Sequence, residues 1–180
     1  MEPDWPIETE RLVLRPYEER DYDALHELYS DADVARWLYY GPSTPEQSRA
    51  KLARKIAAHA LTEESGLAAA VELRDGTYVG DAVLFYMAPV EHRSIELGFS
   101  FDPRHQGNGY ATEAARALVD WAFRVGFHRV YGRLEARNTA SARVLEKLGM
   151  RQEAHLVENE WVKGEWQSEL VYAILDREWR

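Results

Sequence analysis

The sequence predicts a single domain of the mixed α/β class, in which helices flank one mostly antiparallel sheet. The order of the patterns carries this prediction: helix-type spacing dominates residues 21–60, strand-type segments fill residues 67–101, and both types alternate afterwards. The length of 180 residues suits one domain with its own core, and no repeat, low-complexity tract or linker divides it.

The first third of the chain is expected to hold one strand and then two or three helices. RLVLR, residues 11–15, is short and aliphatic and ends at a proline, which is typical of a strand. Residues 21–38 then show helical spacing and predict one helix, with Asp21 as a candidate cap, and a shorter second helix. Thr44 can cap a third helix that has a proline at its first position and runs to about residue 60.

The middle of the chain changes to strand-type spacing. LAAAVEL and TYVGDAVLFYM flank the turn signal Asp75-Gly76 and predict an antiparallel hairpin. SIELGFSF, residues 94–101, alternates cleanly, so Glu96 is expected on the face opposite an apolar row. That row consists of Ile95, Leu97, Phe99 and Phe101.

The last third alternates between helix and strand. A helix is expected from about Gly109 to Val125, with small apolar residues along one side and Gly126 as its end. RVYGRLEA then predicts a strand, and TASARVLEKLG predicts a short helix closed by Gly149. MRQEAHLVENEWV and EWQSELVYAIL predict a final hairpin around Lys163-Gly164. The expected sheet is twisted and has about seven strands.

Composition excludes several classes of function. A formal net charge of −9 opposes general nucleic-acid binding, which needs an excess of Lys and Arg, and suits a cationic partner such as an amine. The absence of cysteine excludes disulfides, thiolate metal sites and a thiol nucleophile, and the histidines are too scattered to predict a metal site. Because the N-terminal residues lack the pattern of a signal peptide and no apolar run has membrane length, we expect a cytoplasmic protein without a membrane partner.

The segment RHQGNGYATEA, residues 104–114, joins the alternating strand to the next helix. It lacks the P-loop pattern, since no lysine follows either glycine, and it misses the dinucleotide fingerprint, because Thr112 stands where a third small residue is needed. What remains is a glycine turn before a helix N-terminus, where free N–H groups and the helix dipole favour a pyrophosphate. Gly107 and Gly109 would let a phosphate approach the main chain; the alternative is that they serve turn geometry alone.

A family resemblance rests on this loop and its surroundings. Arg104-His105-Gln106-Gly107-Asn108-Gly109 matches the [QR]xxGx[GA] acyl-CoA loop of the GNAT superfamily of N-acetyltransferases, and the chain resembles the RimJ/RimL-like branch. The likeness also covers ETERLVLRPYEERDYDAL, IELGFSFDPRHQGNGYATEA, ARNTASARVLEKLGM and VKGEWQSELVYAILDREW. It implies a GNAT domain over residues 7–180 after a short N-terminal extension at residues 1–6. It also implies that two splayed central strands hold acetyl-CoA, the co-substrate, with no metal.

The resemblance also implies which residues contact the coenzyme. Main-chain groups of Phe99 and Phe101 would bond the pantetheine arm, an N–H near Phe99 would meet the oxyanion, and Asn138 would bond the same arm. Lys147 is a candidate phosphate ligand, with a solvated surface lysine as the alternative. The full expected set is Phe99, Phe101, Arg104, His105, Gln106, Gly107, Asn108, Gly109, Tyr110, Ala111, Thr112, Asn138, Ser141 and Lys147.

Two residues are expected to carry catalysis. Glu96 is the candidate base that removes a proton from the amine, and the alternative is a glutamate turned to solvent or paired with an arginine such as Arg93. Many superfamily members have a tyrosine that protonates the leaving thiolate at the position of Leu145. Because that tyrosine is absent here, Ser141 is the candidate acid, with unassisted departure of the thiolate as the alternative.

The acceptor side is expected to be lined by aromatic and acidic residues. Trp37, Tyr39 and Tyr40 would wall it, or serve packing alone, while Glu158 and Glu160 would attract an ammonium. The expected reaction is acetyl transfer to a primary amine, with a peptide or protein N-terminus favoured slightly over a polyamine or aminoglycoside. The alternative function is a non-catalytic CoA-binding sensor or scaffold. The resemblance also implies that the protein forms a homodimer through the last hairpin.

Overall fold

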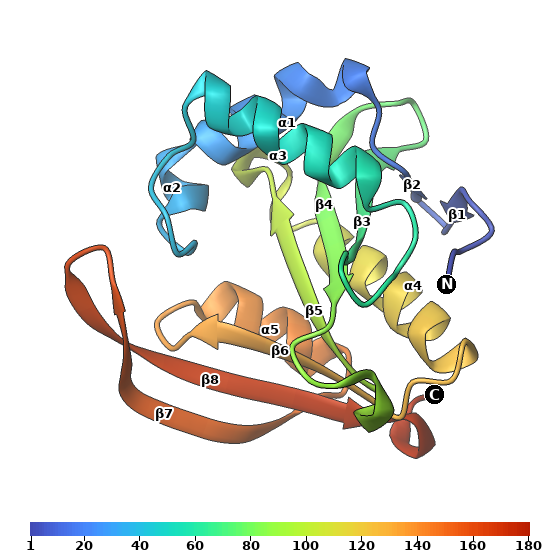
Figure 1. Cartoon of the computed structure of the whole chain (residues 1–180), viewed down its shortest axis with the longest axis vertical. Coiled ribbons are helices and arrows are strands. Elements are labelled where there is room, and N and C mark those ends of the chain that lie inside the picture. The colour runs from blue at the N-terminus through green and yellow to red at the C-terminus, as the bar shows by residue number, and fades with distance from the viewer.

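One sheet runs through the computed structural model, which describes residues 1–180. Its strand order is β1-β2-β3-β4-β5-β6-β8-β7, and every neighbouring pair is antiparallel except β5 with β6 (Figure 1). The strands are β1 (Ile7–Glu8), β2 (Leu12–Arg15), β3 (Leu67–Leu73), β4 (Tyr78–Phe85), β5 (Ser94–Phe101), β6 (Arg129–Glu135), β7 (Arg151–Val162) and β8 (Glu165–Leu175). The predicted mixed sheet is confirmed, and its extra strand arises because Ile7 and Glu8 pair with β2.

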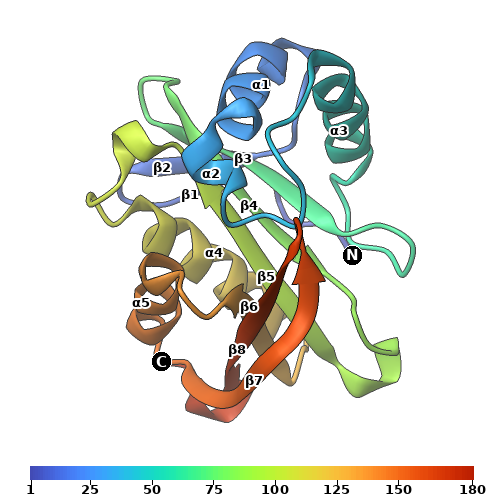
Figure 2. The same ribbon diagram turned by 90° about the vertical axis from the view of Figure 1, so that its left-hand side faces the viewer.

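Helices cover both faces of the sheet (Figures 1 and 2). The helices are α1 (Tyr22–Ser30), α2 (Ala32–Ala35), α3 (Pro45–Ala57), α4 (Tyr110–Arg124) and α5 (Thr139–Lys147). The first three lie over the N-terminal strands on one face, and α4 and α5 lie on the other (Figure 2). Strand β3 contributes to both sides: Ala68 and Ala70 pack with α1 and α3, whereas Leu67 and Val71 belong to the core with α4. Burial on both faces explains why this strand has a continuous apolar sequence.

The predicted helix starts are confirmed at one place and wrong at another. The Thr44 hydroxyl accepts a hydrogen bond from the Gln47 N–H at 3.2 Å, and the Gln47 side chain accepts from the Thr44 N–H at 2.9 Å, so Thr44 caps α3 as expected. The Asp21 carboxylate does not cap α1; it accepts hydrogen bonds from the Arg15 guanidinium at 2.7 and 2.8 Å and from the Glu18 N–H at 2.8 Å. The chain enters α1 through a 3₁₀ turn, Glu19–Asp21, instead.

The two central strands part after a short paired stretch. β5 and β6 pair in parallel only at Ser94–Arg129, Ile95–Val130 and Glu96–Tyr131. Beyond this point β5 stays with β4 as far as Phe101, and β6 stays with β8 as far as Glu135. The splay that the resemblance implied is therefore present, and it opens at Glu96.

The N-terminal residues pack against the body of the fold. The Met1 ammonium donates to the Leu61 carbonyl at 2.7 Å, and the Trp5 indole N–H donates to the His59 carbonyl at 2.9 Å. Residues 1–6 are thus tied to the domain, while the boundary at residue 7 stays a prediction. None of the helices combines the length and the apolar composition that crossing a bilayer requires.

Candidate active site

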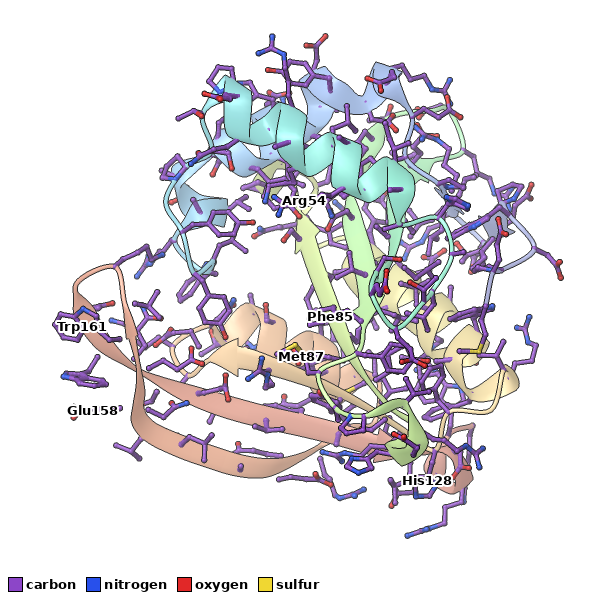
Figure 3. All side chains as sticks on the ribbon, viewed as in Figure 1. Arg54, Phe85, Met87, His128, Glu158 and Trp161 are labelled. Carbon is purple, nitrogen blue, oxygen red and sulfur yellow. The ribbon has the colours of Figure 1, made fainter.

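A cavity of about 680 Å³ lies at the splay of β5 and β6. Its walls come from β4, β5 and β6, from the glycine loop before α4, from α5, and from the segment that contains α2. Most of the predicted site residues line this one space, and Figure 3 shows the side chains around it. A volume of this size is within the range of ligand-binding sites.

The glycine loop presents its main-chain amides without partners. Gly107 and Gly109 have φ of +81° and +83°, in the left-handed region that favours glycine. A Cβ on Gly107 would point into open space. The N–H groups of residues 107–112 donate no hydrogen bond within the protein. The loop therefore offers a row of donors at the N-terminus of α4, which suits an anion.

Arg11, which the sequence reasoning missed, holds the outer side of this loop. Its guanidinium donates to the Asn108 carbonyl at 2.9 Å and to the Glu113 carboxylate at 2.7 Å. Glu113 also accepts a hydrogen bond from the Thr9 hydroxyl at 2.7 Å. These contacts fix the loop to the start of β2 from outside the cavity.

The basic residues expected beside the loop divide into two groups. Arg104 does not line the cavity, because the Asp102 carboxylate accepts from its Nε at 3.0 Å and Glu27 lies 3.0 Å from its Nη1. His105 also lies outside the cavity lining. Lys147 lines the cavity, and so does Arg143, a further cation without an ion pair.

The main chain of β5 faces the gap at the predicted residues. The Asp102 N–H donates to the Val79 carbonyl of the neighbouring chain segment at 3.0 Å. Bonded and non-bonded residues alternate along an antiparallel pair, so Ser100 and Gly98 turn their main-chain groups to β4. Phe99 and Phe101 consequently direct theirs to the side from which β6 has departed. This geometry fits the expected hydrogen bonds from the main chain of Phe99 and Phe101 to the pantetheine arm.

Glu96 is buried at the point where the strands part. Its side chain is 7% exposed, and its Oε2 accepts from the Arg133 Nε at 3.0 Å. Arg93, the alternative partner, instead donates to the Gly126 carbonyl at 2.6 Å. Burial raises the pKa of Glu96, and the charge of Arg133 opposes that shift. Glu96 is thus a carboxylate whose proton affinity exceeds that of a solvated glutamate.

Arg133 joins Glu96 to a second buried carboxylate. Its Nη1 lies 3.5 Å from Oε2 of Glu169, whose side chain is also 7% exposed. Burial raises the pKa of Glu169, and Arg133 again opposes the shift. Neither Arg133 nor Glu169 was predicted, although Arg133 lies two residues beyond the Glu96–Tyr131 pair, on the same face of the sheet.

Asn138 and Ser141 lie at the start of α5. The Asn138 side-chain oxygen accepts from the Ser141 N–H at 3.1 Å, so Asn138 caps α5. The side-chain NH₂ of Asn138 and the hydroxyl of Ser141 make no hydrogen bond within the protein, and both residues line the cavity. Leu145 is 2% exposed and packs into the core.

The expected acceptor residues also separate. Trp37, Tyr39 and Tyr40 line the cavity. Glu160 lies in a recess beside it, whereas Glu158 is exposed on the hairpin and points outward (Figure 3). Glu158 is therefore placed away from the space that an acceptor would enter.

A buried polar cluster forms the far end of the cavity, and no motif in the sequence predicted it. The Asp81 carboxylate accepts from the hydroxyls of Tyr17 at 3.0 Å and Tyr29 at 2.8 Å, and it also pairs with Lys55. Burial, together with the nearby charge of Lys55, lowers the pKa of Lys51 to about 8. These residues come from strand β4, from helices α1 and α3, and from the segment that follows β2.

Known proteins resemble this chain in sequence and structure. The model of the acetyltransferase (GNAT) domain family matches residues 11–151. YnaD of Bacillus subtilis, an uncharacterized N-acetyltransferase, is 33% identical over 96% of this chain and 98% of its own length. The spermidine N(1)-acetyltransferase of Escherichia coli is 26% identical over 92% of this chain and 87% of its own length.

Two solved structures show the same fold. A GNAT-family acetyltransferase from Bacillus anthracis superposes with a TM-score of 0.86 at 33% identity, and covers 96% of this chain and 99% of that one. RimL, a ribosomal-protein alpha-N acetyltransferase in complex with coenzyme A, has a TM-score of 0.81 over 93% of this chain and 95% of its own. The two sequences are 20% identical, so this likeness concerns the fold alone. Together with the matching domain, these findings show that the chain belongs to the GNAT family and is an acetyl-CoA-dependent N-acetyltransferase.

Proposed function

We propose that the protein transfers the acetyl group of acetyl-CoA to a primary amine by direct attack within one ternary complex. The observation that carries this proposal is the row of unpartnered amides at residues 107–112, which opens into the same cavity as the parted strands. Acetyl-CoA supplies an activated thioester, so the chain needs no nucleophile of its own. The absence of cysteine is compatible with this reaction.

The chain's residues would divide the work between the two ends of the gap. The amides at residues 107–112 hold the diphosphate, and Lys147 and Arg143 add positive charge near it. The outward main-chain groups of Phe99 and Phe101 hold the pantetheine arm, together with the side-chain NH₂ of Asn138.

The proton transfers fall to two side chains. Glu96 accepts the proton of the acceptor amine, directly or through water, because its buried carboxylate lies where the strands part. The free hydroxyl of Ser141, which lines the cavity, protonates the leaving thiolate. A main-chain N–H near Phe99 stabilises the oxyanion.

Of the two acceptor classes expected from the sequence, a small amine now has more support than a peptide N-terminus. The spermidine acetyltransferase matches most of this chain at 26% identity, whereas the likeness to the ribosomal-protein enzyme concerns the fold alone. We therefore place small aliphatic amines first.

Release of the free thiol tests this function. Purified protein is incubated with acetyl-CoA and a panel of small amines, peptides and aminoglycosides, while calorimetry measures coenzyme A binding separately. Binding of coenzyme A together with amine-dependent thiol release supports the proposal. Binding without turnover of any amine would favour the sensor or scaffold, and absence of binding would contradict both functions.

A further inference from the structure

A small acidic recess adjoins the main cavity at Arg133, the residue that is paired with Glu96. It has a volume of about 60 Å³, and it shares Trp37, Tyr39 and Arg133 with the lining of the main cavity. Glu135 also lines both spaces, and Glu160 and Glu169 are polar walls of the recess alone. The recess is therefore open to whatever occupies the acceptor side.

One carboxylate oxygen in the recess has no hydrogen-bond partner. Glu169 is 5% exposed, and its buried Oε2 accepts no hydrogen bond. The nearest cation, Arg133, lies 3.5 Å from it and is bonded to Glu96. A buried charged acceptor without a donor is costly, so this atom is suited to a donor that arrives with a ligand.

The charges around the recess favour a cation. Glu135 is already satisfied, because its carboxylate accepts from the Arg137 Nε at 2.7 Å. Glu160 has no ion pair, and Glu96 and Glu169 share the single guanidinium of Arg133. The negative charge of Glu160 also contributes to the raised pKa of Glu169, after burial. The recess thus carries an excess of negative charge, which an ammonium would balance.

The recess is also a fixed feature of the fold. Lys163, in the turn between β7 and β8, donates to the carbonyls of Ala35 at 3.0 Å and Arg36 at 2.8 Å. This contact fastens the β7–β8 hairpin to the segment that carries Trp37 and Tyr39. The two walls of the recess are therefore held together before any ligand binds.

Its size and position limit the group that fits. The recess is more than tenfold smaller than the main cavity, yet it has room for a group the size of a methylene-ammonium. The Arg133 guanidinium contacts Glu96 and also approaches Glu169. A single side chain therefore connects the recess to the candidate base.

We propose that this recess binds a second, non-reacting ammonium of the acceptor, so that the preferred acceptors are short aliphatic diamines. This proposal rests on the proposed acetyl transfer to a small amine. The unpartnered Glu169 oxygen and Glu160 receive the second ammonium, while the first amine lies beside Glu96. A monoamine of the same length leaves the recess without its cation.

A matched pair of acceptors tests the recess. Putrescine is compared with pentylamine, in which a methyl group replaces the second ammonium. For the natural protein we expect kcat/KM to favour putrescine by about tenfold or more, as a charge pair at a desolvated site contributes. Glu169→Gln and Glu160→Gln should each bring this ratio close to one. Glu64→Gln, which removes an exposed carboxylate without partners, should retain it.

A binding measurement separates failure of the recess from failure of the reaction. Calorimetry with coenzyme A present should detect putrescine, and Glu169→Gln should weaken that binding by about tenfold. Binding without turnover would overturn the proposed reaction and uphold the recess. Turnover of pentylamine at the rate of putrescine, or an unchanged ratio in both variants, would overturn the recess alone.

Discussion

Glu96 is subject to two opposing influences that set its usefulness as a base. Burial raises its pKa, which strengthens it as a proton acceptor, while the charge of Arg133 at 3.0 Å opposes that shift and favours the ionised form. A base of this kind matters most for alkyl amines, which are largely protonated at neutral pH. The pair therefore suits a small aliphatic acceptor.

Replacing Glu96 with glutamine should lower kcat/KM for an alkyl amine by about 10²-fold or more, the usual contribution of a general base. Because the raised pKa lies above that of a solvated glutamate, activity of the natural protein should fall as the pH drops through that value. The deficit of Glu96→Gln should shrink at high pH, where the amine loses its proton unaided. Thiol-release rates across a pH series measure both effects; equal activity at every pH would contradict the assignment.

Lys51 provides a second prediction at the level of one residue. Burial lowers its pKa to about 8, so roughly half of its amino groups are uncharged at that pH, whereas an ordinary lysine titrates near 10.4. Only the uncharged amine reacts with acylating reagents. Brief treatment with acetic anhydride should therefore label Lys51 before a free lysine peptide added as an internal standard, as mass spectrometry can measure. Slower labelling than the standard would contradict the lowered pKa.

At the level of elements, the glycine loop combines two demands on Gly107. Its φ of +81° strains any other residue by about 1–2 kcal/mol, and its missing side chain leaves open space before the free amides. Gly107→Ala should weaken coenzyme A binding by about tenfold or more, because the loop moves or the methyl group blocks the diphosphate. Calorimetry gives this affinity.

Gly164 is the matched control for that substitution. Its φ is +89° and its surroundings are equally open, but it lies in the β7–β8 turn and lines neither cavity. Gly164→Ala should lose a similar amount of stability and leave coenzyme A affinity unchanged. Equal loss of affinity in both variants would attribute the effect to general destabilisation.

The elements themselves could be predicted because each has a local signal. The alternation of residues 94–101, the capping residue Thr44 and the Gly126 end of α4 all act within a few positions. The position of the Arg104 side chain was not predicted from such local signals. Its guanidinium is bonded to Asp102, two residues earlier, and so does not reach the glycine loop. An Asp-Pro-Arg turn could have given that warning.

Contacts between strands could not be predicted in the same way. The Glu96–Arg133–Glu169 group depends on β6 pairing with β5 on one side and with β8 on the other. No periodicity within a strand specifies that neighbour or its register. Arg93 looked closer to Glu96 in sequence, yet its bond to Gly126 turns it elsewhere.

At the scale of the whole molecule, the β7–β8 hairpin is the part with the least cover. It projects past the other strands in Figure 1. Leu156, Val157, Trp161 and Trp166 are 42%, 70%, 61% and 58% exposed. The centroids of the two tryptophan rings lie 5.3 Å apart, with the rings packed edge to face. A group of exposed apolar residues on an edge strand is suited to self-association.

We expect two chains to associate through this hairpin, and we expect salt to strengthen the association. Each chain carries a net charge of −9, so the like charges repel, and salt screens that repulsion while it leaves apolar contact intact. Sedimentation velocity should show a dimer that is tighter at high salt, and Trp161→Glu should sediment as a monomer. Met87→Glu places the same charge at an apolar residue that is 58% exposed elsewhere on the surface, and should stay dimeric (Figure 3). If the natural protein remains monomeric at high salt, the exposed tryptophans do not mediate dimerisation. If both variants dissociate equally, the loss of the dimer is due to the added charge and not to a disrupted hairpin contact.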